Sequence, residues 1–139
     1  MKQFFTKINV ESQPGKLIEL TRNISELINN EDISNGLITL YIKHTSASLL
    51  IQENADPDVL YDLENFFNNI APQDLNLYKH QTEGKDDMPA HIKSALTSTH
   101  LSIPLKDKVL MLGTWQGIFL FEHRNRSHSR TIEIHIIGE

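Results

Sequence analysis

Cysteine is absent from this sequence of 139 residues. Its absence excludes disulfide bonds, thiolate metal ligands and thiol nucleophiles together, and it fits a cytoplasmic protein. An excess of positive charge is also lacking, because the formal net charge is −5, and this argues against a nucleic-acid partner. No apolar run approaches membrane-spanning length, and no charged-then-apolar leader opens the chain. We therefore expect a soluble, cytoplasmic protein without a membrane partner.

Familiar local motifs are missing as well. The sequence has no internal repeat, low-complexity tract or long linker, which favours a single domain over residues 1–139. It has no Walker-type glycine loop and no GxGxxG, so a nucleotide is not the expected ligand. It has no HExxH either, so a metal site would have to be assembled from residues far apart in the chain.

What remains is a chain with strand patterns at both ends and helical patterns between them. Runs rich in apolar, β-branched and aromatic residues predict strands at residues 3–10, 16–20, 36–44, 47–53, 101–105, 108–112, 117–123 and 130–138. The strands at 36–44 and 47–53 bracket the polar corner "HTS", and we expect them to be adjacent. This order predicts an α+β domain in which mostly antiparallel, sandwich-like sheets pack with two to three helices.

Capping signals place the helices. The first is predicted at residues 21–30 with Thr21 as its N-cap. The clearest helix has Asp56 as its cap and Pro57 in its first position. Its apolar face is predicted to carry Val59, Leu63, Phe66, Phe67 and Ile70. A shorter helix is predicted to begin with Pro89 in its first position.

The seven histidines offer the ligands that a metal site without cysteine needs. His44 and His123 each end a predicted strand on the face of its apolar row. His91 falls in the first turn of the shorter helix, where the positive end of the helix dipole favours the neutral ring. We expect these three histidines to converge on one divalent metal ion, with His80 as a fourth ligand.

Carboxylates gather just before that helix, in the stretch "HQTEGKDDMPAHIK" at residues 80–93. Asp86 and Asp87 precede the predicted helix start, where negative charge is stabilised, and we expect one of them to cap the helix. Together with Glu83 they are more than capping needs. The surplus points to acid/base work or to support of a metal ion.

Basic residues follow the last of these histidines and flank the acidic stretch. The segment "EHRNRSHSR" supplies Arg124, Arg126 and Arg130, while Lys85 and Lys93 lie on either side of the aspartates. Arginine binds phosphate in a bidentate manner. We therefore expect a small phosphorylated metabolite as the partner of this site.

Three stretches, "HTSASLLIQENADPDV", "EGKDDMPAHIKS" and "LGTWQGIFLFEHR", followed by the closing "GE", resemble the YjbQ family of secondary thiamine-phosphate synthase enzymes. The resemblance runs from about residue 37 to the C-terminus. It implies a YjbQ-like domain that assembles as a homotrimer with its polar pocket at the subunit boundaries. The residues that match the family motifs are His44, Ser46, Asn54, Asp56, His80, Glu83, Asp86, Asp87, His91, Trp115, Gln116, Glu122, His123 and Arg130.

The resemblance also implies a transferase. Hydroxymethylpyrimidine diphosphate and a thiazole phosphate would be joined with release of pyrophosphate, which requires charge stabilisation on the leaving group. In this reading the catalytic residues are Glu83, Asp86, Asp87 and Arg130. The residues expected to contact substrate are Ser46, Asn54, Lys85, Trp115 and Gln116.

The histidine-rich ligand set favours zinc, nickel or manganese as the cofactor, and magnesium is a less suitable ion for it. For that reason a metal-dependent hydrolase or lyase acting on a phosphorylated small molecule fits the ligands as well as the synthase does. A trimer that binds a phosphorylated metabolite without turning it over is the competing class. A structural trimer whose histidines only form hydrogen bonds is the third.

Overall fold

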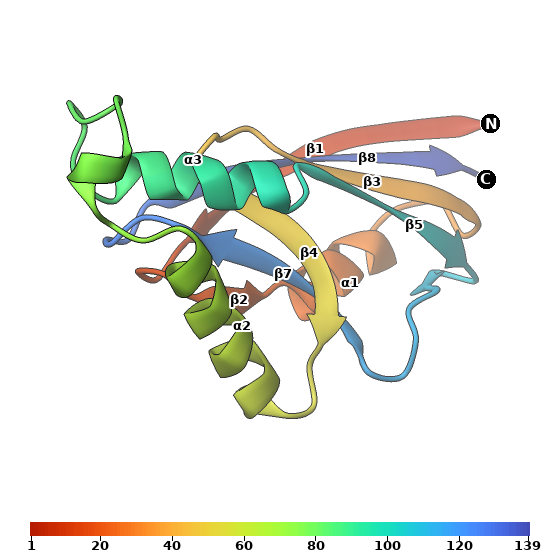
Figure 1. Ribbon diagram of the computed structural model, residues 1–139. Coiled ribbons are helices and arrows are strands. Elements are labelled where there is room, and N and C mark those ends of the chain that lie inside the picture. The colour runs from red at the N-terminus through yellow and green to blue at the C-terminus, as the bar shows by residue number, and fades with distance from the viewer.

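Antiparallel pairing joins all the strands and divides them between two sheets (Figure 1). The computed structural model describes residues 1–139. The five-stranded sheet has the order β1 (Lys2–Glu11), β8 (Ser129–Gly138), β3 (Gly36–Ile42), β5 (His100–Lys106) and β6 (Val109–Leu110). The three-stranded sheet has the order β2 (Leu17–Glu19), β7 (Gln116–Glu122) and β4 (Ala47–Glu53).

The main core lies between the two sheets. Every second residue of β8 is buried, and β3 shows the same alternation, as the pleat of a strand with one face in the core requires. Helix α1 (Thr21–Asn29) contributes Ile24 and Ile28, which are fully buried. The 17 buried members of this core are Leu20, Ile24, Ile28, Ile33, Ile38, Leu40, Ile42, Ala47, Leu49, Ile103, Leu105, Leu110, Ile118, Leu120, Ile132, Ile134 and Ile136.

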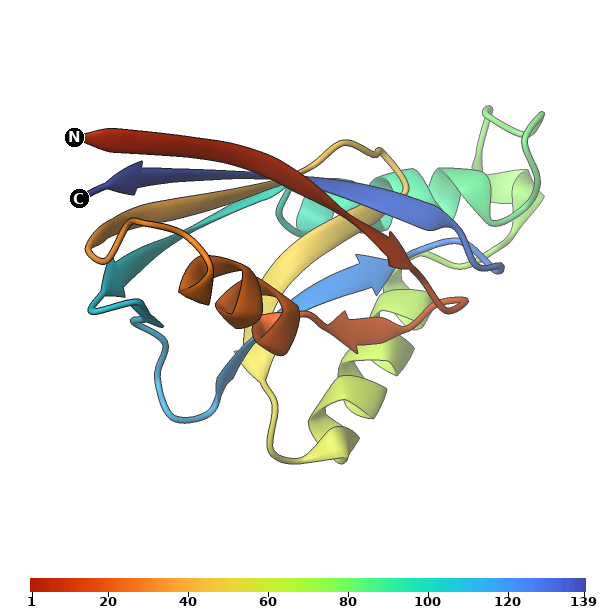
Figure 2. The same cartoon turned by 180° about the vertical axis from the view of Figure 1, so that it is seen from behind.

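Helix α2 (Pro57–Ile70) covers the other face of the three-stranded sheet (Figures 1 and 2). Phe119 and Phe121 of β7 pack on this side, and the ring of Phe121 meets that of Phe67 edge-on at 5.4 Å between centroids. β7 is therefore buried on both faces, since its other side enters the main core. Its unbroken apolar run "GIFLF" reflects this position.

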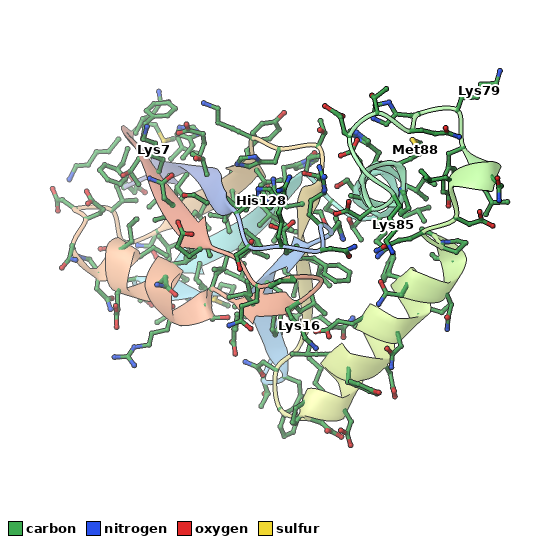
Figure 3. All side chains as sticks on the ribbon, turned by 90° about the vertical axis from the view of Figure 1, so that its left-hand side faces the viewer. Lys7, Lys16, Lys79, Lys85, Met88 and His128 are labelled. Atoms are coloured by element: carbon green, nitrogen blue, oxygen red, sulfur yellow. The ribbon has the colours of Figure 1, made fainter.

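Helix α3 (Asp87–Leu96) packs against the start of β4, where Ser94 Oγ donates a hydrogen bond of 3.4 Å to the carbonyl of Ala47. Figure 3 shows the molecule from the side on which the N-terminal end of α3 lies, with Lys85 and Met88 near that end. The short 3-10 helix η1 (Leu75–Leu77) and the loop after it connect α2 to α3. The acidic stretch singled out in the sequence is therefore the loop before α3 and its first two turns.

The predicted fold class is confirmed: the chain is an α+β domain with antiparallel sheets in a sandwich-like arrangement and three helices. The expected neighbourhood of residues 36–44 and 47–53 is wrong, because β3 pairs with β5 and β8 while β4 pairs with β7 in the other sheet. The polar corner after β3 therefore carries the chain from one sheet to the other.

Two helix starts also differ from the prediction. The N-cap position of α1 is Leu20, and Thr21 Oγ1 instead accepts a hydrogen bond of 2.9 Å from the amide of Ile118. Helix α3 begins at Asp87, so Pro89 is its third residue and not its first. His91 consequently lies beyond the first turn, where the helix dipole acts most strongly, and the dipole argument for its neutral form is weakened.

Helix α2 begins as predicted, since the Asp56 side chain accepts a hydrogen bond of 2.9 Å from the amide of Asp58. Its predicted apolar face is only partly correct. Leu63 and Phe67 pack on the sheet together with Leu60, whereas Phe66 and Ile70 are exposed. No helix of the molecule combines the length and the apolar character that a membrane crossing requires.

Replacing Asp56 by alanine removes the only side-chain cap found on the three α-helices. We expect the free energy of unfolding, measured by urea denaturation, to fall by about 1 kcal/mol. The matched control is Asp62→Ala in the exposed middle of the same helix, which should change it by less than about 0.5 kcal/mol. An equal loss in the two variants would contradict the capping role.

Candidate functional site

Two histidines and two carboxylates converge at the start of α3. Asp87 and His91 are one helical turn apart, and the preceding loop brings His80 and Glu83 to the same face. One ligand atom from each of these four side chains lies within 4.8 Å of those of the other three. Asp87 Oδ2 is the shared centre, at 2.7 Å from His80 Nε2 and 3.2 Å from His91 Nε2. We call these four residues the His/Asp cluster.

Arg124 fixes the central carboxylate of the cluster. Its Nη1 donates a hydrogen bond of 2.6 Å to Asp87 Oδ1, while its Nε donates one of 2.9 Å to Asp86 Oδ2. Its Nη2 donates to the backbone carbonyl of Glu83 at 2.9 Å. One guanidinium thus binds the loop and the helix start together. Only Asp87 Oδ2 is left to face the two imidazoles.

The cluster is closed at its base and open at its rim. The Asp87 side chain is 4% accessible, against 34% for His91, 40% for His80 and 62% for Glu83. Such a half-open arrangement resembles catalytic metal sites, which keep a position for water or substrate, more than closed structural ones.

Charge within the cluster changes the protonation of its members. The hydrogen bond to Asp87 raises the pKa of His80, and the bond to Glu83 acts in the same direction. Burial alone would raise the pKa of Asp87, but the hydrogen bond from His80 and the charge of Arg124 hold it below its ordinary value. Asp87 is therefore ionised at neutral pH and can bind a cation.

Asp86 does not cap α3, although it occupies the N-cap position. Its carboxylate accepts from Arg124 and from the backbone amide of Asn125, the latter at 2.9 Å. Asp87 makes no cap either, so the expectation that one of the two aspartates caps the helix is wrong. Both carboxylates are directed at the connection between β7 and β8 and at the cluster.

His44 is not part of the cluster. Its Nε2 accepts a hydrogen bond of 2.8 Å from the amide of Thr131, and its Nδ1 lies 3.4 Å from Arg130 Nη1. The lone pair of Nε2 is thus already engaged within the fold. His44 does line, together with His91, a shallow depression of about 250 Å³ beside α3.

His123 is likewise outside the cluster and almost fully buried, with 2% of its surface accessible. Its Nε2 lies 2.8 Å from Ser48 Oγ. Burial, with the nearby charges of Lys93 and Arg130, lowers the pKa of His123 to about 3. The predicted convergence of His44, His91 and His123 is therefore not found within one chain, where His91 is joined by His80, Glu83 and Asp87.

Arg130 is buried in an ion pair. Its Nε donates to Glu122 Oε1 at 2.8 Å, and its Nη2 donates to the other oxygen of that carboxylate and to Ser46 Oγ at 3.0 Å. The side chains of Arg130 and Glu122 are 5% and 0% accessible. The predicted phosphate contact of Arg130 stays a prediction, and in this chain its guanidinium neutralises Glu122.

The remaining predicted contact residues lie elsewhere. Gln116 begins β7 and Trp115 precedes it, so they lie seven and eight residues from His123, or roughly 23–26 Å of extended chain. Asn54 lies beside them, because its backbone N–H donates a hydrogen bond of 3.0 Å to the backbone carbonyl of Trp115. Lys85 is exposed in the loop before α3. The residues predicted to bind substrate thus fall into two groups at opposite ends of the smaller sheet.

Sequence reasoning missed the role of Arg124, which was grouped with the phosphate-binding arginines. It also missed the polar side chains of α2 and of the loops near Lys93, among them Asn68, Gln73 and Asn125. Asparagine and glutamine have no local motif of their own.

Comparison with known proteins gives a consistent result. A family model described as "UPF0047 protein YjbQ-like" matches residues 6–139. The UPF0047 protein sll1880 of Synechocystis sp. is 50% identical over 94% of this chain and 88% of its own length. The UPF0047 protein YjbQ of Escherichia coli O157:H7 is 44% identical over 84% of this chain and 83% of its own.

Solved structures show the same fold. A protein of the yjbq/upf0047 family from Clostridium acetobutylicum has a TM-score of 0.86 and 30% identity, covering 95% of this chain and 99% of that one. A YbjQ-like protein of unknown function from Sulfolobus solfataricus, SSO2532, has a TM-score of 0.89 at 23% identity, with 99% of both chains covered.

The burial of Arg130 gives a test that separates structure from phosphate binding. Arg130→Met leaves Glu122 buried without its partner, and we expect the free energy of unfolding to fall by about 3–5 kcal/mol. Adding Glu122→Gln should recover part of that loss, because the uncompensated charge is then gone. The exposed Arg126→Met is the control, with a change within about 0.5 kcal/mol. Full stability in Arg130→Met would refute the structural role.

Proposed function

This chain belongs to the UPF0047 family of YjbQ-like proteins, and from that premise we propose that it is a divalent-metal-dependent enzyme acting on a phosphorylated small molecule. The His/Asp cluster is the observation that carries the proposal. The reaction we propose is a thiamine-phosphate synthase-like coupling, in which the carbon–oxygen bond to a diphosphate breaks, a carbon–nitrogen bond to a thiazole phosphate forms, and pyrophosphate leaves.

The donor set of the cluster suits a divalent cation. Two imidazole nitrogens and two carboxylate oxygens are a ligand set typical of zinc, nickel or manganese, whereas magnesium prefers oxygen alone. The ligand atoms lie within 4.8 Å of one another, so small side-chain shifts bring them to the separations of roughly 3–3.5 Å found between ligands that bind zinc at about 2.0–2.2 Å. Arg124 supports the fit, because it holds Asp87 from behind as outer hydrogen-bond partners do in metal sites.

A bound cation would neutralise charge on the departing pyrophosphate. The protein groups around it do the remaining work. Glu83 is the most exposed of the four cluster side chains, so it is the ligand that can exchange with substrate and move a proton at the rim. Lys85 stands in the same loop and offers a second positive charge to a phosphate.

Assembly as a homotrimer forms part of the proposal. Trp115 and Gln116 lie too far from the cluster along β7 to share a small ligand with it in one chain. The outer face of the five-stranded sheet leaves Phe5, Leu37 and Tyr41 exposed, and exposed apolar side chains of this size favour contacts between copies.

Light scattering should give a mass three times that of the 15.9 kDa chain. A monomer at micromolar concentration would contradict the assembly.

Metal binding tests the cluster directly. The stripped and reloaded protein should retain about one zinc, nickel or manganese ion per chain by elemental analysis. His80→Gln and His91→Gln should each lose it, because each removes one nitrogen ligand. His100→Gln is the control, since His100 is exposed and lies outside the cluster. If the His80→Gln/His91→Gln double variant keeps the full metal content, the ligand assignment is wrong.

Metal affinity should rise with pH. His80 must lose its proton to bind a cation, and its pKa is raised by Asp87 and Glu83. The proton therefore competes more strongly below that raised pKa, and affinity should increase as pH rises through it and then level off. Titration calorimetry between about pH 5.5 and 8.5 measures this trend. Affinity that does not change with pH would exclude His80 as a ligand.

The reaction is tested separately from the site. Purified metal-loaded protein should couple hydroxymethylpyrimidine diphosphate with thiazole phosphate and release pyrophosphate, and the chelator-stripped protein should not. The His91→Gln variant provides the matched loss. Failure to couple under every metal, with both precursors recovered intact, would refute the synthase reaction and favour a binding protein.

A further inference from the structure

A second polar cavity lies on the other side of α3 from His91. It has a volume of about 470 Å³ and opens between α2, α3 and the turn before β2. Lys93 lines it, and a separation of two residues on a helix turns Lys93 by roughly 200° from His91. Only two of the 12 lining residues are hydrophobic. None of the four cluster residues is among them.

Lys93 is a buried cation without an anionic partner. Its accessible fraction is 3%, and its Nζ donates one hydrogen bond, of 2.7 Å, to Asn68 Oδ1. An ammonium has three N–H donors, so two remain for a ligand. The negative charge of Asp86 acts on Lys93, but that carboxylate is already bound to Arg124.

This isolation stands out because other interior charges of the fold are paired. Glu122 has Arg130, and Asp86 and Asp87 share Arg124. Burying an unpaired charge destabilises the folded state, so such a group is retained at a cost to stability. An anion that enters the cavity would remove that cost.

His123 supplies a second unmet group in the same cavity. Its Nδ1 is buried and has no hydrogen-bond partner. The Thr97 hydroxyl donates a hydrogen bond of 2.6 Å to Ser48 Oγ. Ser48 therefore directs its own proton to His123 Nε2, which lies 2.8 Å away. The neutral imidazole then carries its proton on Nδ1, as a donor without an acceptor.

Amide side chains complete the lining. Gln73 and Asn125 pair with each other through two hydrogen bonds of 2.8 and 2.9 Å, while Lys16 is held by Glu64 at 3.0 Å. Figure 3 places Lys16 on the β2 side, facing α2. These groups give the cavity a polar wall. Its one lining carboxylate, Glu64, is already paired with Lys16.

We propose that this cavity binds the phosphate group of a small phosphate monoester, whose anionic oxygens accept hydrogen bonds from Lys93 Nζ and from His123 Nδ1. A phosphate group has three oxygens that accept hydrogen bonds, so one group can accept from both donors. A cavity of about 470 Å³ also leaves room for a small organic group attached to the phosphate. The site does not use the His/Asp cluster, so it stands whether or not that cluster holds a metal.

Titration calorimetry with inorganic phosphate and with methyl phosphate, on chelator-stripped protein, tests the proposal. Removing metal ensures that any binding is not through a cation at the cluster. Wild-type protein should bind both probes, and Lys93→Met should weaken binding at least tenfold. Lys106→Met, at an exposed lysine of β5 away from the cavity, should bind as wild type does. No binding to the wild-type protein, or equal binding to Lys93→Met, overturns the proposal.

Two further measurements keep a structural role of Lys93 distinguishable. In phosphate-free buffer Lys93→Met should melt at the same or a higher temperature, whereas a lysine kept for stability would give a lower one. Asn68→Asp places a carboxylate against Lys93 Nζ, and should raise the melting temperature while abolishing phosphate binding. Binding that survives Asn68→Asp unchanged would overturn the assignment.

Discussion

The guanidinium of Arg124 is the contact on which the candidate site depends. It joins the connection after β7 to the first residues of α3 through Asp86, Asp87 and the Glu83 carbonyl. Because the Arg124 and Asp87 side chains are only 12% and 4% accessible, solvent screens the pair little. The Arg124–Asp87 ion pair fixes the orientation of the carboxylate: because Arg124 holds one oxygen of Asp87, the other oxygen faces His80 and His91.

The same helix separates two chemically different environments. On one face imidazoles and carboxylates gather, which favours a cation. On the other a buried ammonium and an unpartnered imidazole nitrogen gather, which favours an anion. Asp86 contributes to both, since its negative charge acts on Lys93 while its oxygens bind Arg124. A metal on one face and a phosphate on the other are thus compatible within one small domain.

Local pattern predicted much of this fold, for clear physical reasons. Neighbouring residues determine the alternation along β3 and β8 and the Asp56–Pro57 start of α2, and both were found where expected. Neighbouring residues do not determine which strand another strand pairs with. The corner after His44 reads like a hairpin, yet β4 crosses to β7.

The site was predictable in part for the same reason. The polar composition of residues 80–93 indicated a functional site, and four of these residues do converge. The predicted set of three histidines was inferred largely from the faces of predicted strands. Strand periodicity gives the direction of a side chain, but it does not show which hydrogen-bond partners that side chain already has. His44 Nε2 is engaged by the amide of Thr131 and His123 Nε2 by Ser48, contacts 87 and 75 residues apart in sequence. Hydrogen-bond partners this far apart in sequence cannot be predicted from hydrophobic periodicity.

X-ray absorption at the zinc edge of the reconstituted protein is the most direct test of the central claim, because it counts imidazole ligands on the metal itself. The geometry of the His/Asp cluster predicts two imidazoles with oxygen ligands in the wild-type protein, and one imidazole in His91→Gln. Three imidazoles would restore His44 or His123 as a ligand and contradict the account, and so would a metal surrounded by oxygen alone.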